Sequence, residues 1–321
     1  MKAAVVAAAG KLPVYGEFRE PTPADGENRI TVSAAALCPL AKSRASGVHY
    51  SASQDFPFIA GVDGVGRRED GRRVYFILPK APFGSMAERV VAPQAHCVAV
   101  PNDLDDVTVA ALANPGMSSW AAFKERARLV PGETVLINGA TGTAGRLAIA
   151  IAKHLGAGKV IATGRNATSL QSLRSLGADV TIPLGDDDAL GRALQHEFAD
   201  GIDVVIDYLW GRSAEAILTA GAKHGKRDVA IRFVQLGAPT GANIGLPGGT
   251  LRSAPIALMG SGLGSVPFHR LVAAVDDLLR AASAGGFEIA TRAVPLSGVE
   301  QAWASESCTP RVVFTPAGSG S

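Results

Sequence analysis

The sequence predicts an α/β protein with two domains, a doubly wound parallel sheet and a β-rich domain. Strand-like and helix-like segments alternate between residues 111 and 286, as expected for right-handed parallel crossovers. Residues 1–110 contain short strand-like runs that proline and glycine interrupt, and residues 287–321 return to that pattern. We therefore expect one domain over 1–110 and 287–321 and another over 111–286. The total of 321 residues suits about two domains, because a single core rarely grows far beyond roughly 250 residues.

Composition excludes several classes of protein. The formal net charge is +2 and the basic residues are scattered, so we expect no nucleic-acid partner. Cys38, Cys97 and Cys308 form no CxxC pair, which argues against a disulfide framework and a structural zinc site and is typical of a cytoplasmic protein. No apolar run approaches the roughly 20 residues that a membrane helix needs, so we expect no membrane partner either.

The two ends of the chain each allow two interpretations. The opening MKAAVVAAAG is similar to a weak signal peptide, but Lys11 and Pro13 follow the short apolar run, and a first strand explains it better. The final AGSGS has the composition of a flexible linker, and whether it is native stays open.

The β-rich domain is expected to be a partly closed barrel, because turn clusters separate its strands and no helical stripe joins them. Its strands are expected at residues 2–6, 29–37, 72–78, 87–93, 97–101, 288–294 and 311–315. The parallel sheet is expected from strands at 134–138, 159–163, 179–183, 203–209, 231–237 and 255–261. Helices are expected at 145–155, 168–177, 188–198, 213–225 and 267–283.

Three glycines follow the first strand of the parallel sheet in the segment LINGATGTAG. Side chains at Gly139 and Gly142 would hold a pyrophosphate away from the backbone, and one at Gly145 would push the following helix off the sheet. The helix N-terminus offers unpaired N–H groups and a positive dipole end to an anion. This segment therefore predicts a dinucleotide site, to which Thr141, Thr143 and Ala144 also belong.

The end of the second strand predicts which nicotinamide cofactor binds. An acidic residue about 20 positions after the glycines would favour NADH, because it would hydrogen-bond the adenosine ribose. The chain has Gly164, Arg165 and Asn166 there, and a guanidinium suits a 2′-phosphate. We expect NADPH, although an arginine at a strand end can also be simply solvated.

Five stretches together resemble the zinc-independent, quinone-oxidoreductase-like branch of the medium-chain dehydrogenase/reductase superfamily. They are GATGTAG, the C-terminal return to the first domain, PFIAGVDGVG (57–66), FGSMAERVVAP (83–93) and ALANPGMSSWAAF (111–123). The resemblance covers essentially the whole chain. It implies a dinucleotide-binding Rossmann domain at 111–286, a GroES-like catalytic domain, and a homodimer paired through the last strand of the parallel sheet.

The resemblance also separates this chain from zinc-dependent relatives, in which a cysteine near position 38 and a histidine within Gly-His-Glu bind the metal. Cys38 is present, but Val62 occupies the place of the histidine and is followed by Asp63. His96 and Cys97 are poor substitutes, because neighbours in a strand point to opposite faces. We therefore expect no zinc, with Cys38 at the catalytic site as a small apolar filler near the substrate rather than as a ligand.

Two further departures remove polar groups that this branch often carries. Cys38-Pro39 followed by Ala41 replaces an Asn-Pro with a nearby Asp. Thr168 and Ser169 stand where a lysine often helps to hold the 2′-phosphate, which leaves that task to Arg165.

Reduction of a plain ketone needs a Lewis acid or a well-placed proton donor, and the sequence offers neither a zinc set nor a Tyr-x-x-x-Lys pair. Hydride addition to a quinone or an enone is easier, because the charge spreads to a conjugated oxygen. Tyr50 is the candidate donor or substrate clamp, ahead of His49, and a merely amphipathic surface role for Tyr50 is the alternative. Few charges flank this region, so an apolar or aromatic carbonyl or quinone substrate is expected.

Tyr208 at the end of a parallel strand either flanks the nicotinamide or is a packed aromatic. By resemblance, the nicotinamide end is also lined by Ser118, Leu236, Gly237, Ala238, Gly260 and Ser261. Arg311 is either close to the cofactor or a surface charge.

Three functions remain open at this point. The first is an NADPH-dependent reductase of quinones or activated C=C bonds. The second is an NADPH-binding sensor or structural protein with little turnover, and the third is a zinc-independent ketone or aldehyde reductase. The sequence does not identify the physiological substrate.

Overall fold

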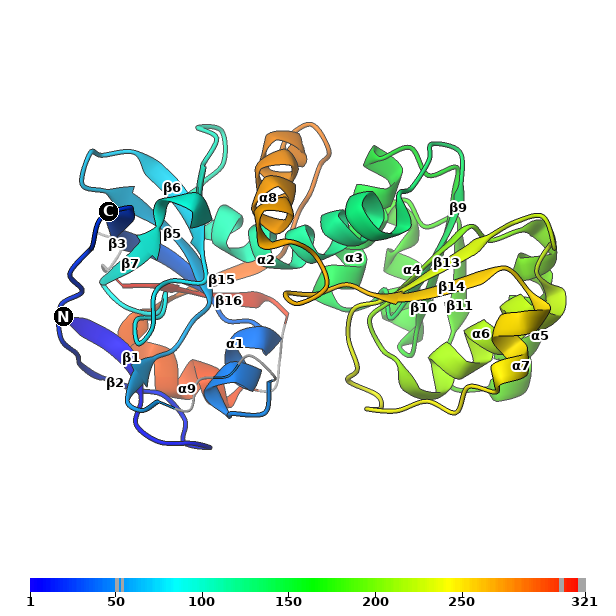
Figure 1. Ribbon diagram of the computed structural model, residues 1–321, viewed down its shortest axis with the longest axis horizontal. Helices are drawn as coiled ribbons and strands as arrows, with labels where there is room; N and C mark the ends of the chain where they lie inside the picture. Colours follow the sequence, from blue (N-terminus) through cyan, green and yellow to red (C-terminus); the bar gives the residue numbers. More distant parts are fainter. Residues whose placement is uncertain (50–51, 53–54, 306–308, 317–321) are drawn as a thin grey trace. The chain divides into compact units, whose positions relative to one another are not determined.

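A computed structural model describes residues 1–49, 52, 55–305 and 309–316. The chain forms two compact units (Figure 1). The first contains Met1–Asn114, Val275–Ser283 and the segment from Glu288 onward, and the second contains Pro115–Ala274 and Ala284–Phe287. The segment Val275–Ser283 of the first unit contains the C-terminal part of the helix α8 (Phe268–Ala282). None of the described helices is both long and apolar enough to cross a membrane.

The first unit is built on two sheets. A three-stranded sheet has the order β2-β1-β4, and a larger one has the order β15-β16-β3-β5-β6-β8 with β7 paired to β3. Apart from the parallel pair β15 and β16, neighbouring strands in both sheets are antiparallel. The strands are β1 (Lys2–Val6), β2 (Val14–Glu17), β3 (Glu27–Ala36), β4 (Phe58–Ile59), β5 (Asp63–Arg68), β6 (Arg73–Ile77), β7 (Arg89–Pro93), β8 (Cys97–Ala99), β15 (Thr291–Pro295) and β16 (Arg311–Thr315).

The first unit also contains helices that the sequence did not predict. They are α1 (Pro39–Ala45), the start of α2 (Asp106–Ala121) and α9 (Val299–Ala304), together with the short turns η1 (Gln94–His96) and η4 (Leu296–Gly298). Pro39 at the first helical position and the Cys38 cap are the local signals for α1. The expectation that His96 lies in a strand beside Cys97 was wrong, because His96 ends the 3₁₀ turn η1.

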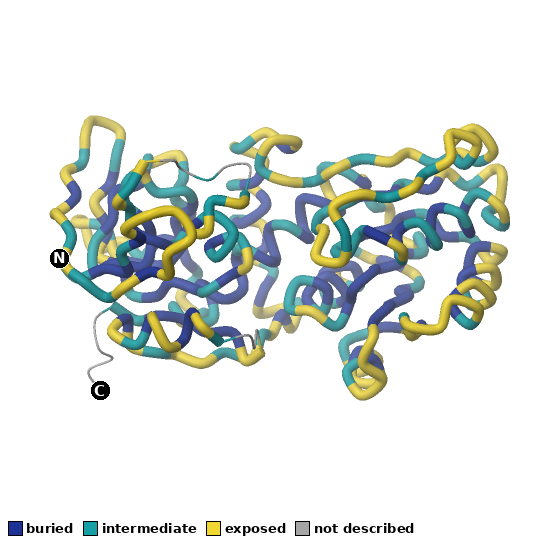
Figure 2. Tube along the Cα trace, turned by 90° about the horizontal axis from the view of Figure 1, so that it is seen from below, coloured by how far each residue is buried: buried dark blue, intermediate teal, exposed yellow. Residues whose placement is uncertain are grey.

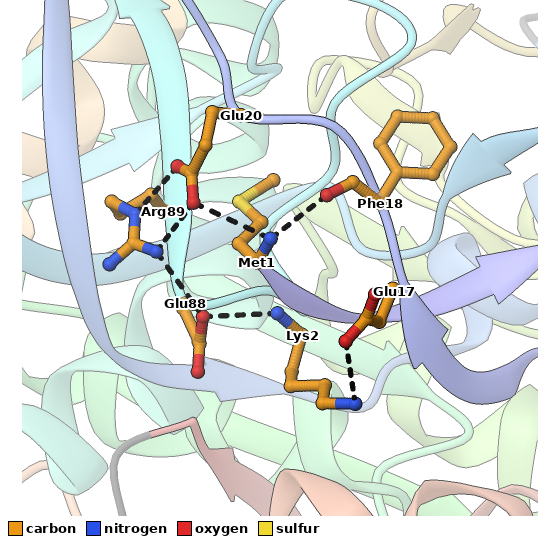
Figure 3. Close-up of polar contacts among 7 residues, drawn as sticks. All are labelled: Met1, Lys2, Glu17, Phe18, Glu20, Glu88 and Arg89. Carbon is orange, nitrogen blue, oxygen red and sulfur yellow. Dashed lines mark hydrogen bonds and ion pairs between the residues drawn. The ribbon is translucent and has the colours of Figure 1, made fainter.

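Charged side chains connect three strands at one end of the first unit. Arg89 of β7 forms two hydrogen bonds with the Glu20 carboxylate, at 2.7 and 2.6 Å (Figure 3). The Met1 amine lies 3.4 Å from Glu20 and donates to the Phe18 carbonyl. These contacts hold the pKa of Glu20 down at about 2, chiefly through its hydrogen bond with Arg89. The cluster fixes the segment after β2 against β1 and β7.

The second unit is a six-stranded sheet of order β11-β10-β9-β12-β13-β14 in which neighbouring strands are parallel (Figure 1). The predicted alternation of strands and helices is confirmed. The strands are β9 (Thr134–Asn138), β10 (Lys159–Gly164), β11 (Val180–Pro183), β12 (Val204–Asp207), β13 (Ile231–Gln235) and β14 (Ile256–Gly260). The helices are the end of α2, the π-helical turn η2 (Ala122–Ala127), α3 (Thr143–His154), α4 (Ala167–Ser172), η3 (Arg174–Leu176), α5 (Asp187–Asp200), α6 (Gly211–His224), α7 (Gly248–Ser253) and the first part of α8 (Phe268–Ala282).

The central strands of this sheet are buried (Figure 2). One face packs Leu136, Ile161 and Val205 against Leu194 and Phe198 of α5 and against α6. On α3, Leu147 and Ile151 are buried as predicted from the helical stripe, whereas Leu155 lies just beyond the helix and is half-buried. The buried strands place their carboxyl ends along one edge, which is where the candidate site residues gather.

Candidate functional site

The glycine loop connects β9 to α3. The reason that it needs glycine at position 139 differs from the predicted one. Gly139 has φ +86°, and a side chain there would meet Leu209 Cγ at 2.7 Å. Glycine is therefore required at position 139 by the backbone conformation and by the nearby Leu209 side chain, and not only by an approaching phosphate. A side chain at Gly145 would lie 2.6 Å from Ala140 Cα and from the Gly139 carbonyl. Gly145 therefore keeps the helix close to its own loop.

Gly142 is the glycine that leaves space for a ligand. It has φ −75°, which other residues adopt, and a side chain there would meet only the Gly139 carbonyl, at 3.8 Å. Gly142 caps α3 without a side-chain hydrogen bond, and the first turn, which includes Thr143 and Ala144, has no acidic residue. The α3 N-terminus thus has no side-chain cap, and Gly142 leaves open space beside it, as an anion site requires.

Arg165 follows the end of β10, which lies beside the glycine loop. A side chain at Gly164 would come within 3.2 Å of Thr141 Oγ1, so the end of β10 lies against the loop. Arg165 is exposed, and its guanidinium has no hydrogen bond or ion pair within the described chain. Asn166 instead caps α4, because its Oδ1 accepts the Ser169 N–H at 2.8 Å. Within the described chain, Arg165 is therefore a cation beside the loop without a hydrogen-bond or ion-pair partner. Asn166 orients the segment that carries Arg165.

A buried polar network at the strand ends supports the glycine loop, and sequence analysis missed it. Asn138 at the end of β9 donates to Asp207 at 2.8 Å and to Ser213 at 2.9 Å, and it accepts from Thr163 at 2.7 Å. Thr163 Oγ1 accepts the Gly139 N–H at 3.1 Å. The available signal was a polar residue at the last or next-to-last position of three neighbouring strands, namely Asn138, Thr163 and Asp207. This network fixes the backbone from which the glycine loop starts.

Asp207 is fully buried at the end of β12 and organises the next loop. Its carboxylate accepts the Leu209 N–H at 3.0 Å and the Trp210 N–H at 3.1 Å. Trp210 has φ +62°, a conformation that side chains rarely adopt, so the carboxylate stabilises a strained turn. Burial raises the pKa of Asp207, and these hydrogen bonds oppose that rise.

Tyr208 is held by α2. Its hydroxyl lies 2.7 Å from Ser119 Oγ, which also donates to the Pro115 carbonyl at 3.0 Å. Burial raises the pKa of Tyr208, so the phenol stays protonated at neutral pH. Ser118, predicted at the nicotinamide end, precedes Ser119 and is half-buried. The tyrosine hydroxyl is therefore committed to α2.

The other predicted nicotinamide-end residues meet at the same sheet edge. The Leu236 N–H donates to the Asp207 carbonyl at 2.8 Å, and a side chain at Gly237 would lie 2.8 Å from the Tyr208 carbonyl. Ala238 follows and is exposed. Gly260 ends β14, and the Ser261 N–H donates to the Gln235 carbonyl at 2.9 Å. The second unit thus gathers its predicted residues, from Gly139 to Ser261, at the carboxyl ends of its strands.

In the first unit, Cys38 is buried and caps α1, where its Sγ accepts the Ala41 N–H at 3.3 Å. Burial, and next the charge of Asp63, raises the pKa of the thiol to about 11. The group is therefore a neutral thiol at neutral pH. The predicted donor Tyr50 lies outside the described residues. His49 is described, and burial, followed by the charge of Arg44, lowers its pKa.

Arg311 was predicted either near the cofactor or on the surface, and the surface alternative was wrong. It is only 6% exposed at the start of β16. Its charge acts on Asp63, which is 1% exposed and accepts from Tyr75 at 3.1 Å and from Asn114 at 3.4 Å. Burial raises the pKa of Asp63 to about 6 against these contacts. Within the described chain, Arg311 Nε and Nη2 have no hydrogen-bond partner.

Comparisons with known proteins match both units. Residues 144–280 match a family model described as zinc-binding dehydrogenase. A probable NADPH-dependent quinone reductase of Emericella nidulans is 28% identical, over 95% of this chain and 96% of its own. The structure of a Thermus thermophilus quinone oxidoreductase, also studied with NADPH, is 26% identical with a TM-score of 0.82, over 98% of this chain and 100% of that one.

The chain is therefore similar to quinone oxidoreductases of the medium-chain dehydrogenase/reductase superfamily, the resemblance that its sequence predicted. A further relative, a 2-haloacrylate reductase of Burkholderia, is 28% identical over 60% of this chain and 61% of its own. The predicted fold class, a Rossmann sheet with a separate β-rich domain, is confirmed.

The family model's name implies zinc, and the residues can be tested against it. Catalytic zinc takes three protein ligands in most enzymes. Among the described residues, no three His, Cys, Asp or Glu side chains gather closely enough to hold a metal. Cys38 uses its sulfur to cap α1, and Val62 brings no ligand. These residues do not fit a catalytic zinc, so the proposed reaction does not use one.

Proposed function

We propose that this protein is an NADPH-dependent reductase that transfers hydride to a quinone or to an activated C=C bond without zinc. The observation that carries the proposal is the open space outside Gly142, which faces an α3 N-terminus with no side-chain cap and lies in a loop packed against Gly164. These groups suit a pyrophosphate, and Arg165 suits a 2′-phosphate.

NADPH is the cofactor, and it supplies the hydride when bound. The backbone of residues 142–145 would hold its pyrophosphate, while the network of Asn138, Thr163 and Asp207 keeps that backbone in place. The relatives named for NADPH support this assignment. Leu236, Gly237, Gly260 and Ser261 are proposed to line the nicotinamide end, and their position at the carboxyl ends of the strands supports this.

A quinone or an activated C=C bond is favoured because the described residues offer binding and orientation rather than strong acid catalysis. The Cys38 thiol is a poor acid, since burial raises its pKa to about 11. Delocalised charge on a conjugated oxygen needs only a weak donor or water, and Tyr50 remains the proposed donor or clamp. The quinone reductase and 2-haloacrylate reductase among the relatives support this substrate class.

Two further predictions remain proposals. A homodimer is supported by β14, the outermost strand of its sheet, where Leu258 is 37% exposed. A cytoplasmic location rests on cysteine usage, and the described Cys38 and Cys97 are free thiols.

The cofactor assignment is tested by Arg165→Ala. Loss of a charge-assisted phosphate contact should raise KM for NADPH by about tenfold or more and leave KM for NADH nearly unchanged. Arg192→Gln, at an exposed position on α5, is the matched control and should change neither value. Equal preference for NADPH and NADH in the unaltered protein would contradict the assignment.

The reaction is tested by following NADPH consumption with quinones, enones and simple ketones. Turnover of the first two classes without added zinc is expected. NADPH binding with negligible turnover across the panel would instead support the sensor alternative, and preferred reduction of simple ketones would support the ketone reductase.

A further inference from the structure

The first unit contains a cavity of about 630 Å³ that the proposed function leaves unassigned. It lies among α1, β4 and the segments that surround them. A volume of this size suits a small organic molecule. Its walls are formed by residues 17–19, 41, 44–45, 55–62, 79 and 81–83.

Four phenylalanine rings belong to the cavity wall. The rings of Phe56 and Phe58 lie 5.3 Å apart, and those of Phe18 and Phe83 lie 6.0 Å apart in an edge-to-face arrangement. Each ring is only half-buried. Aromatic walls that keep accessible area favour a flat, apolar ligand body.

Arg44 is a half-buried cation of this wall that has no counter-charge within the described chain. Arg44 of α1 is half-buried, and burial lowers its pKa. Its guanidinium has neither a hydrogen bond nor an ion pair anywhere in the described chain. A partly desolvated charge without a partner is costly, so an anion at this position would be stabilised.

The other charged residues of the wall do not fill this role. Glu17 is 83% exposed at its side chain and pairs with Lys2 at 3.3 Å. Asp55 is exposed. Arg19 is also exposed and lies over the Phe83 ring at 5.7 Å.

We propose that this cavity binds a small aromatic carboxylate, with the carboxylate on Arg44 and the ring against Phe56 and Phe58. A planar guanidinium matches a carboxylate with two parallel hydrogen bonds. A single half-buried cation suits one negative charge better than the two of a phosphate ester. The site requires no cofactor and lies wholly within the first unit.

The test uses the full chain without NADPH and trans-cinnamate as the probe, with trans-cinnamamide as its neutral counterpart. Calorimetric titration should show cinnamate binding more tightly than cinnamamide by about tenfold or more. In Arg44→Gln this difference should disappear, and Arg44→Lys should retain part of it. Arg19→Gln is the control and should leave the cinnamate affinity nearly unchanged.

A second variant separates the apolar contribution from the charge. Phe58→Ala should weaken cinnamate and cinnamamide by the same factor, and thermal melts should show that each variant is folded. Equal cinnamate affinity in the unaltered protein and in Arg44→Gln would overturn the proposal, as would cinnamamide binding as tightly as cinnamate. Neither result would affect the NADPH assignment, which is measured separately through Arg165.

Discussion

Asp207 and Asp63 are both buried carboxylates at strand ends, but their surroundings differ in kind. Asp207 ends β12 and accepts two backbone N–H groups together with the Asn138 amide. Asp63 begins β5 and, among the described residues, accepts from the side chains of Tyr75 and Asn114, with the charge of Arg311 nearby. The second unit thus uses an acid to set backbone geometry, whereas the first unit buries an incompletely paired charge.

The largest expected effect comes from Asp207→Ala, which removes the better-satisfied carboxylate. The Leu209 and Trp210 N–H groups and the Asn138 amide would all lose their acceptor, so the free energy of unfolding should fall by about 4 kcal/mol. Urea unfolding measures this loss. Asp228→Ala, at an exposed position, is the control. A loss below about 1 kcal/mol would mean that Asp207 does not organise this edge.

Gly145→Val tests whether the loop that this network supports is rigid. Its side chain would lie 2.6 Å from Ala140 Cα and the Gly139 carbonyl, so the loop or α3 must move. We expect NADPH affinity to fall about a hundredfold, or about 2.7 kcal/mol, by fluorescence titration. Gly191→Ala on α5 is the control, because a side chain there meets open space. Unchanged affinity would show that the loop adapts.

Asp63→Asn tests the buried carboxyl of the first unit through the pH dependence of the free energy of unfolding. Because folding raises the pKa of Asp63 from 3.8 to about 6, its stabilising contribution is full below pH 3.8 and is lost as pH rises through 6. The stability of the variant relative to the unaltered protein should therefore increase by about 2 kcal/mol between about pH 4.5 and 7. Urea unfolding at several pH values measures the slope, and parallel pH curves would contradict it.

Tyr208→Phe should have the smallest effect. It removes one hydrogen bond to Ser119 and should lower the free energy of unfolding by about 1 kcal/mol. Turnover with a quinone should stay within about twofold if the hydroxyl only links β12 to α2. Tyr15→Phe is the control, since the Tyr15 hydroxyl has no hydrogen bond within the described chain. A tenfold loss of kcat with unchanged stability would favour contact with the reactants.

The parallel sheet could be predicted because most of its strands are short, largely apolar runs that a helical stripe follows. The first unit was harder to predict. Its strand β5 contains Gly64, where a side chain would lie 2.8 Å from the Ala34 carbonyl of β3. Glycine at such a close approach has the same sequence signature as a turn. Helix α1 was missed because seven residues show too little periodicity.

The candidate site was predicted in part for a similar reason. Glycines and Arg165 follow a local spacing, so sequence alone could place them. The contact of Asn138 with Asp207 joins residues 69 positions apart, and the pairing of Asp63 with the charge of Arg311 spans most of the chain. Such contacts depend on strand order, which local patterns do not contain.

Gly142 offers an experimental opportunity of a different kind. Gly142 has backbone angles that alanine adopts readily, and there is space for a methyl group, so Gly142→Ala causes no backbone strain. The added methyl group would stand where the pyrophosphate is proposed to rest. Such a variant would keep its melting temperature yet lose most of its response to NADPH, providing a folded reference against which any cofactor-independent property of this protein can be measured.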